Sequence, residues 1–191
     1  MAAPAQANKL LLDGEALRRT VVRIAHEIVE RNPDLERTAL VGIHTRGVPL
    51  AQRLRRLIEE FTGREVALGT LDITFHRDDV HVRGGGAPLH PQPVVRATRL
   101  DFPLEGRTCV LCDDVLYTGR TIRAAIDALF DYGRPARVQL AVLVDRGHRE
   151  LPIRPDYVGK NLPTSHDERI QVQLLEVDEV DRILLQPTPG K

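Results

Sequence analysis

Two adjacent carboxylates, Asp113 and Asp114, stand where an apolar run that begins at Thr108 ends. The segment Thr-Gly-Arg-Thr at residues 118–121 follows, with backbone N–H groups, two hydroxyls and a guanidinium, before an amphipathic pattern begins. Polar side chains that follow a strand lie at the carboxyl edge of an open α/β sheet, where such sheets bind ligands. Donors at a helix N-terminus suit a phosphate group. The spacing therefore predicts a site for a ribose 5-phosphate, with the carboxylates facing the sugar hydroxyls.

A second candidate loop, His44-Thr45-Arg46-Gly47, follows a short apolar run at residues 39–43. Glycine lets the backbone approach an anion closely, and an arginine can donate to two oxygens of one anion at once. Alone, this tetrapeptide fits an ordinary loop equally well. Beside the segment at Asp113, it predicts a second anion-binding loop at the same edge of the sheet.

Helices and strands alternate along the chain and must position these loops. Asp13 is the predicted N-cap of an amphipathic helix over residues 14–31, and Pro49 begins a second helix. A third helix follows residue 121 and ends at Gly133. This order predicts an α/β fold with a mostly parallel sheet flanked by helices. The predicted strands are residues 39–43, 65–75, 108–114, 137–144, 157–158 and 170–177.

One domain is expected over residues 10–185, with residues 1–9 disordered and residues 186–191 as a tail. Residues 76–98 follow neither the helical nor the strand period and include three consecutive glycines and three prolines. A segment of this length without a period is typical of a functional lid or a disordered loop. We therefore predict a flexible loop at residues 72–98.

The composition excludes a general attraction to nucleic acid. The 27 basic and 27 acidic residues give a formal net charge of zero, so a nucleic-acid site must be a local patch. No apolar run reaches the roughly 18 residues of a membrane span, and the N-terminus lacks a signal pattern. We expect a cytoplasmic protein with no membrane partner.

Cys109 and Cys112 have the Cys-x-x-Cys spacing of a redox or zinc motif. Both lie in the strand predicted at residues 108–114, where an odd offset points two side chains to opposite faces. The sequence has no second pair of cysteines to complete a zinc site. Two buried core thiols are therefore the favoured interpretation.

The run Val-Leu-Cys-Asp-Asp-Val-Leu-Tyr-Thr-Gly-Arg-Thr at residues 110–121 resembles the phosphoribosyl pyrophosphate (PRPP) signature of the type I phosphoribosyltransferases. The resemblance implies the fold of that family, with residues 72–98 as its flexible hood. It implies that Asp113 and Asp114 hold the ribose hydroxyls directly or through Mg²⁺, and that residues 118–121 hold the 5-phosphate. The implied substrate-binding residues are Thr45, Arg46, Gly47, Val115, Leu116, Tyr117, Thr118, Gly119, Arg120, Thr121 and Val158.

The implied reaction displaces pyrophosphate from the anomeric carbon and needs no protein nucleophile. Positioning and stabilisation of the leaving group's charge supply the catalysis. Asp113 and Asp114 are the expected catalytic and metal-binding residues, and Arg77, at the root of the hood, is expected to neutralise the departing pyrophosphate. Asp78 and Asp79 are alternative magnesium ligands, or part of a solvated charge cluster.

Tyr117 gives an indication of the base that is transferred. Purine phosphoribosyltransferases carry an aspartate immediately before the Thr-Gly of the signature, where it acts on the purine ring. This chain has Tyr117 at that position. The resemblance therefore disfavours a purine and favours a pyrimidine substrate.

A second distinctive run, residues 143–161, carries several basic side chains in a short span. On the helix at residues 14–31, a rotation of about 100° per residue puts Arg19, Arg23 and His26 opposite the apolar stripe, so they face solvent. A basic stripe and a basic loop can form a local phosphate-binding surface on a neutral protein. Because Glu27 and Glu30 are interspersed, an ordinary solvated helix face is the alternative.

Five segments together resemble the family of pyrimidine operon attenuators that are also uracil phosphoribosyltransferases. The similarity spans about residues 10–180. This chain departs from the family pattern at two places that bear on the hood's contacts: His44 stands where the family has a lysine, and the hood is rich in glycine and proline. The segments are residues 23–27, 41–47, 71–79, 110–121 and 144–160.

This resemblance implies two functions: conversion of uracil and PRPP to UMP and pyrophosphate, and uridine-nucleotide-dependent binding of a hairpin in pyrimidine operon mRNA. The implied partners are PRPP, uracil, UMP or UTP, and the hairpin, with Mg²⁺ as cofactor, in a homodimer or higher homo-oligomer. Val22, Ala25 and Val29 form a second apolar flank of the first helix, which is either an interface or more core. The RNA-binding candidates are Arg23, His26, Arg146, Arg149 and Lys160.

Two alternatives remain at this point. A plain salvage phosphoribosyltransferase for another base would have no specific affinity for RNA. A regulator that binds nucleotide without turnover would bind RNA and form no UMP.

Overall fold

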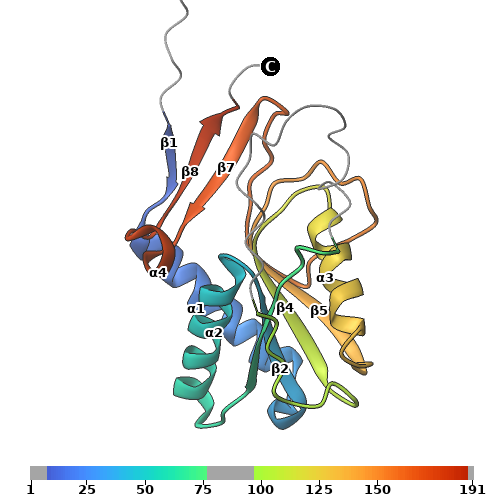
Figure 1. Ribbon diagram of the computed structural model, residues 1–191. Coiled ribbons are helices and arrows are strands. Elements are labelled where there is room, and N and C mark those ends of the chain that lie inside the picture. Colours follow the sequence, from blue (N-terminus) through green and yellow to red (C-terminus); the bar gives the residue numbers. More distant parts are fainter. Residues whose placement is uncertain (1–7, 77–96, 189–191) are drawn as a thin grey trace, which may run out of the picture.

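A computed structural model describes residues 8–76 and 97–188, which form two β-sheets (Figure 1). The large sheet has five parallel strands in the order β3-β2-β4-β5-β6, and the small sheet has three antiparallel strands in the order β1-β8-β7. The prediction of an α/β fold with a mostly parallel sheet is confirmed. The strands of the large sheet are β2 (Thr38–Ile43), β3 (Ala67–Leu71), β4 (Thr108–Leu116), β5 (Arg137–Asp145) and β6 (Tyr157–Asn161).

Helices cover both faces of the large sheet (Figure 1). α1 (Gly14–Arg31) and α2 (Gly47–Thr62) pack on one face, and α3 (Arg120–Phe130) packs on the other. The carboxylate of Asp13 caps α1 as predicted, because it accepts the N–H of Ala16 at 2.8 Å. α2 begins two residues before the predicted start at Pro49, which lies in the first turn, where a missing N–H costs little.

Each face of β4 contributes to a different hydrophobic core. Val110 and Cys112 pack beneath α1 and α2, whereas Cys109 and Leu111 pack beneath α3. Both cysteines are free and buried, and burial raises the pKa of Cys109 to about 11 and also raises the pKa of Cys112. The prediction of two core thiols on opposite faces of one strand is confirmed.

The small sheet is the main feature that the sequence patterns did not predict. It consists of β1 (Lys9–Leu12), β7 (Glu168–Gln173) and β8 (Arg182–Pro187), and the short helix α4 (Leu175–Asp178) connects β7 to β8. The strand predicted at residues 170–177 is therefore wrong beyond Gln173. The chain turns there because the carboxylates of Asp178 and Asp181 accept the N–H groups of Leu174 and Leu175, at 2.9 and 2.8 Å.

Other predicted boundaries also differ. Lys9 begins β1 by pairing with β8, so the predicted disorder of residues 1–9 is wrong at Lys9, and β8 extends to Pro187 inside the predicted tail. The strand predicted at residues 65–75 is only β3, because the carboxylate of Asp72 accepts the N–H and the hydroxyl of Thr74 and forms a turn. Residues 77–96 of the predicted loop at 72–98 lie outside the described residues.

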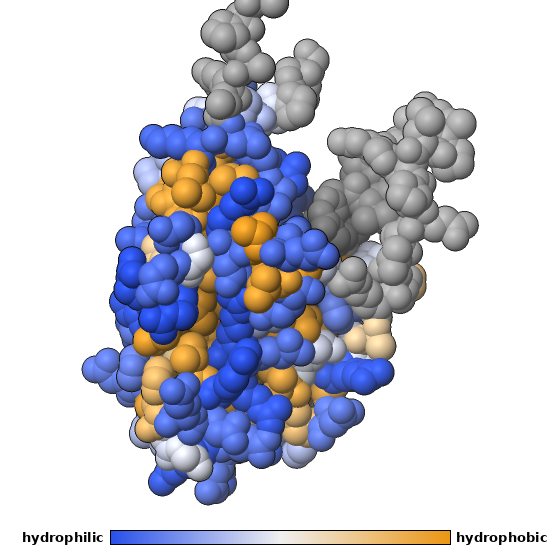
Figure 2. Space-filling view, turned by 90° about the vertical axis from the view of Figure 1, so that its left-hand side faces the viewer, coloured by the Kyte–Doolittle hydropathy of each residue, from blue (hydrophilic) through white to orange (hydrophobic). Residues whose placement is uncertain are grey.

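The small sheet lies beyond the carboxyl ends of the large sheet's strands, with α4 beside the start of α2 (Figure 1). Figure 2 views the molecule from the side of β1, α4 and α2, and shows hydrophobic residues in separate patches between hydrophilic ones. On α1, Ala25 is buried and Val29 packs against the core, so two of the three positions of the proposed apolar flank belong to the core. In the described ranges, no helix has the length and apolar character needed to span a membrane.

Candidate active site

The loops that follow β2 and β4 lie side by side at the carboxyl edge of the large sheet. The two strands pair in parallel, with Gly42 opposite Cys112. An added Cβ on Gly47, the first residue of α2, would lie 2.1 Å from the carbonyl oxygen of Cys112 and 3.3 Å from the Cα of Asp113. A side chain at residue 47 would push the two loops apart, because protein interiors leave no room for such an overlap. Close packing therefore requires glycine here, whether or not an anion also approaches it.

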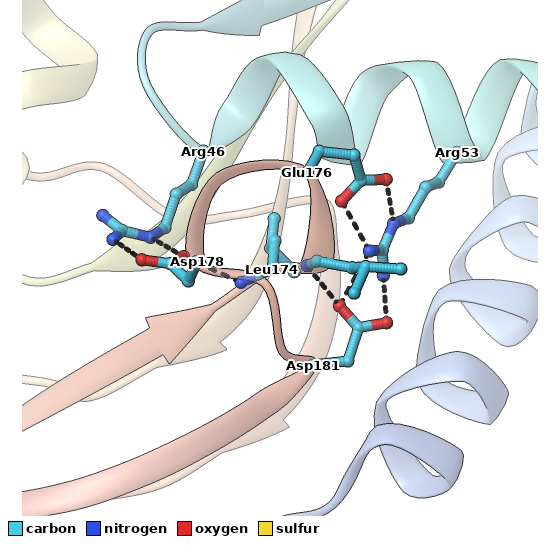
Figure 3. Close-up of polar contacts among 7 residues, drawn as sticks. Arg46, Arg53, Leu174, Glu176, Asp178 and Asp181 are labelled. Carbon is cyan, nitrogen blue, oxygen red and sulfur yellow. Dashed lines mark hydrogen bonds and ion pairs between the residues drawn. The ribbon is translucent and has the colours of Figure 1, made fainter.

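Arg46, in the loop after β2, is held by a residue from α4. Its Nε and Nη2 donate to the two carboxylate oxygens of Asp178 at 3.0 and 2.6 Å (Figure 3). This contact raises the pKa of Arg46 and lowers the pKa of Asp178. Arg46 also interacts electrostatically with Asp114. The fold thus brings Arg46 near the carboxylate pair, and it adds a partner that the sequence did not indicate.

Asp113 and Asp114 end the apolar run of β4 inside this site. Asp113 is only 7% exposed, and its Oδ1 accepts the N–H of Asp114 at 2.9 Å. The Oδ1 of Asp114 accepts the N–H of Val115, also at 2.9 Å. Burial raises the pKa of Asp114, although hydrogen bonding with Asp113 and the charge of Arg46 oppose the increase. Two adjacent buried carboxyls favour a ligand that brings positive charge or hydrogen-bond donors.

The oxygen donors of this pair fit Mg²⁺. Magnesium usually keeps several waters and binds through one or two carboxylates together with substrate phosphates. Asp113 and Asp114 supply two carboxylates, and no group of three or more His, Cys, Asp or Glu side chains that could hold a metal occurs in residues 8–76 and 97–188. The pair therefore fits an ion that completes its coordination from a diphosphate and water.

Residues 118–121 form the turn from β4 into α3. Gly119, the N-cap of α3, has a φ of 95°, in the left-handed region that favours glycine. The hydroxyl of Thr118 accepts the N–H of Arg120 at 3.3 Å. Gly119 has no side chain that could cap α3. A phosphate is therefore a suitable acceptor for the N–H groups of the first turn of α3. Val115 and Leu116 pack their side chains into the two cores, and both residues pair with β5, so a substrate contact by either of them stays a prediction.

The loop at residues 146–155 packs over this turn. The carbonyl of Thr118 accepts the N–H groups of Glu150 and Leu151 at 3.0 and 3.1 Å. The carboxylate of Glu150 accepts the Nε–H of Arg120 at 2.7 Å. Leu151 also packs against Gly119, where an added Cβ would lie 3.3 Å from its side chain. This loop therefore fixes the turn from its outer side.

Arg146 and Arg149 of the same loop direct their charges inward. Arg149 donates to the carbonyls of Tyr117 and Ile153 at 2.8 and 2.9 Å and pairs with Asp145. Arg146 is 7% exposed, lies over the ring of Tyr117 at 4.1 Å from its centroid, and has a pKa lowered by burial. Arg146 is therefore buried against Tyr117, and an RNA contact by this residue stays a prediction.

Residues 8–178 match the family described as phosphoribosyl transferase domain. The chain belongs to this family. It is 61% identical over 170 residues to the protein named Bifunctional protein PyrR of Roseiflexus sp. (strain RS-1), covering 89% of this chain and 90% of that protein. It is 58% identical over 180 residues to the protein of the same name from Thermus aquaticus, covering 94% of this chain and 96% of that protein. The resemblance predicted from the sequence motifs is confirmed.

Solved structures show the same fold. The hypoxanthine phosphoribosyltransferase of Trypanosoma cruzi has a TM-score of 0.68 at 18% identity, covering 95% of this chain and 97% of that chain. The hypoxanthine phosphoribosyltransferase of Staphylococcus aureus has a TM-score of 0.67 at 15% identity, covering 97% of this chain and 94% of that chain. The predicted type I phosphoribosyltransferase fold is confirmed, and at this identity the likeness carries no information about the base.

A pocket of this phosphoribosyltransferase lies between β6 and the loop at residues 146–155. Val158, a predicted substrate-binding residue, lines it together with Asp145, Arg149 and Ile153. Tyr117 is 36% exposed and has its ring edge-on to His148, with centroids 5.9 Å apart.

Three predicted RNA-binding residues of this phosphoribosyltransferase lie on the surface of α1 and β6. Arg23 is exposed, and its Nη2 also donates to the carbonyls of Val158 and Gly159 at 2.9 and 2.6 Å, which ties α1 to β6. His26 is exposed and stacks on Phe61 of α2 with ring centroids 4.0 Å apart. Lys160 is exposed on β6, which is the edge strand of the large sheet.

Some predicted site residues are not described by the structure, and one neighbour of the site was not predicted. Arg77, the third predicted catalytic residue, lies outside the described residues, as do the alternative magnesium ligands Asp78 and Asp79. Asp178 is a polar neighbour of the site that the sequence reasoning missed. Its signal is weak, because a single acid in an acidic stretch 132 residues beyond Arg46 does not indicate a contact with that arginine.

Proposed function

We propose that this chain converts uracil and PRPP to UMP and pyrophosphate and that, with UMP or UTP bound, it binds a hairpin of pyrimidine operon mRNA as a transcription attenuator. One observation carries the proposal: the carboxylate pair in the last part of β4 lies a few residues before the N-terminal turn of α3, and the loop that contains Arg46 packs beside it. The relatives' name, Bifunctional protein PyrR, supports two functions in one chain.

The residues of the site have distinct roles in the proposed transfer. Asp113 and Asp114 accept the ribose 2- and 3-hydroxyls and hold the sugar, while residues 118–121 donate to the 5-phosphate. Thr45, Arg46 and Gly47 hold the diphosphate, and Arg46 stabilises the charge that develops on it as it leaves. When bound to PRPP, Mg²⁺ supplies charge neutralisation to the leaving diphosphate. Arg77 is proposed to assist at the same group.

The proposed base is uracil. The position before Thr118 holds Tyr117, whose ring packs under Arg146 and offers no carboxylate to a purine ring. The pocket at Val158 is the proposed place for the base, because it lies at the same sheet edge and is lined by the loop at residues 146–155, which packs over the turn from β4 into α3.

The proposed RNA surface is centred on Arg23, His26 and Lys160. These side chains are exposed on neighbouring elements, and positive charge there suits an RNA backbone without giving the whole protein a net charge. With four Phe, three Tyr and no Trp, the chain has few rings for base stacking, so phosphates and exposed hairpin bases are the expected targets. Arg149 is proposed to act indirectly, because it connects the phosphate turn with the loop that leads to β6.

The enzymatic half of the proposal is tested by incubating the purified chain with Mg²⁺ and PRPP and with uracil, cytosine or hypoxanthine as the base. We expect nucleotide and pyrophosphate to form with uracil at a rate at least about 100-fold above that with hypoxanthine. Turnover with hypoxanthine alone would show a salvage enzyme for another base.

The regulatory half is tested by filter binding to a pyrimidine-leader hairpin with and without UMP. We expect UMP to tighten hairpin binding, and a hairpin of the same length with a scrambled loop to bind weakly in both conditions. Hairpin affinity that UMP leaves unchanged would contradict nucleotide-dependent attenuation and would favour a plain salvage enzyme in the cytoplasm. We also propose that the chain forms a homodimer or higher homo-oligomer, which light scattering tests by measuring the molar mass in solution.

A further inference from the structure

The carboxylate of Asp178 is fixed from two directions. Its Oδ2 accepts both the Nε–H of Arg46 at 3.0 Å and the N–H of Leu174 at 2.9 Å, while its Oδ1 accepts the Nη2–H of Arg46 at 2.6 Å. The side chain is 13% exposed, compared with 29% for Arg46. The carboxylate therefore has little freedom to follow a moving arginine, and its geometry dictates where the guanidinium lies (Figure 3).

A guanidinium has five N–H donors in a fixed plane. The bidentate pair with Asp178 uses one donor on Nε and one on Nη2, and Nη1 has no partner among the described residues. Because the guanidinium also interacts electrostatically with Asp114, it lies close enough to the carboxylate pair to be part of the same site. Arg46 is thus anchored along one edge and keeps donors for a ligand along the other.

A second arginine anchors α4 to α2 without reaching the site. Arg53 donates to both carboxylate oxygens of Glu176 at 2.8 and 2.6 Å and to both of Asp181 at 3.0 and 2.7 Å (Figure 3). The acidic turn made of Glu176, Asp178 and Asp181 therefore forms two separate links to α2. One link ends at the diphosphate loop, and the other ends two turns further along the helix.

We propose that Asp178 is a positioning residue for the diphosphate of PRPP, and that it presents the free edge of the Arg46 guanidinium to that group. This inference rests on the proposed function, because it assigns the loop after β2 to the diphosphate. Without Asp178, the arginine has to be ordered by the ligand itself, which weakens binding of the diphosphate and leaves binding of the base unaffected. In the opposite case, Asp178 competes with the diphosphate for the guanidinium of Arg46, and removal of the Asp178 carboxylate strengthens binding of the diphosphate.

The test compares wild type with Asp178→Asn and with the matched control Glu176→Gln, which breaks the link of α4 to Arg53 alone. PRPP and inorganic pyrophosphate binding is measured by calorimetry in Mg²⁺, and KM for PRPP and for uracil is measured separately. We expect Asp178→Asn to weaken PRPP and pyrophosphate binding by roughly tenfold, with KM for uracil within about twofold of wild type. Glu176→Gln is expected to match wild type in all four quantities.

A double-mutant cycle separates positioning from general loss of structure. In an Arg46→Ala background, Asp178→Asn should have no further effect on pyrophosphate affinity, because no guanidinium is left to position. Equal weakening in both backgrounds, unchanged affinity in Asp178→Asn, or tighter binding in Asp178→Asn would each overturn the inference. Failure of the proposed function would look different: wild type would form no UMP, while the calorimetric comparison of pyrophosphate binding would still be readable.

Discussion

The loop after β4 is held by its own residues and by the loop at residues 146–155, with Arg120 and Glu150 30 residues apart, whereas the loop after β2 is held by a residue 132 positions away. In the first loop, Asp113 bonds to the next residue, Asp114, and Thr118 bonds to Arg120. In the second loop, the N–H of His44 donates to the carbonyl of Leu71 at 3.0 Å, and Arg46 pairs with Asp178, 132 residues away. One half of the site is thus held by itself and by a loop about 30 residues later in the chain, and the other half is held by an element near the far end of the chain.

This difference has a functional consequence. A loop held by nearby segments keeps its geometry as long as those segments form, so it suits the ribose 5-phosphate that both PRPP and UMP carry. A loop assembled from distant segments responds to movement of any of them. The loop proposed to hold the diphosphate is therefore tied to the small sheet through α4.

The largest expected effect comes from Asp114→Asn in the local loop. The change removes a charge that we propose to hold the ribose, and we expect UMP formation to fall by about 100-fold or more. Because burial raises the pKa of Asp114, its ionisation disfavours the fold at neutral pH, so the ligand-free variant should melt at a higher temperature than wild type. Steady-state kinetics and calorimetric melting measure the two effects. An unchanged rate of UMP formation in Asp114→Asn would contradict the proposed role of Asp114.

The next effect concerns the close contact between the two loops. Gly47→Ala would place a Cβ 2.1 Å from the carbonyl oxygen of Cys112, and we expect a loss of about 2 kcal/mol of folding stability. Gly63→Ala is the control, since Gly63 has open space around it but a φ of 65°. Its cost should be about 1 kcal/mol, from the left-handed conformation alone. Denaturant unfolding that ranks the two variants in the reverse order would contradict the packing argument.

A smaller effect is expected on the RNA surface, away from both loops. Lys160→Gln should weaken binding of the pyrimidine-leader hairpin by about tenfold and reduce the salt slope by about one unit, with UMP formation unchanged. Arg37→Gln, at the amino end of β2, is the control and should change neither quantity. Equal losses in both variants would indicate a non-specific electrostatic effect.

The smallest effect is the acid sensitivity of the distant loop. The pKa of Asp178 is lowered by its hydrogen bonds to Arg46, so the stabilisation is present above the ordinary pKa of aspartate and is lost as the pH falls below about 4. At neutral pH, wild type should therefore be more stable than Asp178→Asn by about 1 kcal/mol or less in free energy of unfolding. The melting temperatures of the two proteins should differ at neutral pH and converge in acid. A difference that persists at low pH would show that the pair is not its origin.

The same contrast explains what could be predicted from the sequence. Nearby patterns predict the strand that carries Asp113, the turn at Gly119 and the helix capped by Asp13. The small sheet does not, because its strands come from both ends of the chain and pair over more than 170 residues of sequence, as Lys9 with Leu185. Arg146 was expected on an RNA-binding surface because it lies in the basic run at residues 143–161. Its guanidinium instead lies over the ring of Tyr117 and donates to the carbonyl of Ser165, and the fold creates both contacts.

The link between the nucleotide site and the RNA surface is the central claim, and thermodynamic reciprocity tests it most directly. If UMP tightens hairpin binding by some factor, the hairpin must tighten UMP binding by the same factor. The decisive measurement is calorimetric titration of the wild-type chain with UMP, alone and with saturating hairpin. The account predicts a lower Kd for UMP in the presence of the hairpin, by the factor found in filter binding. An unchanged Kd for UMP would contradict it.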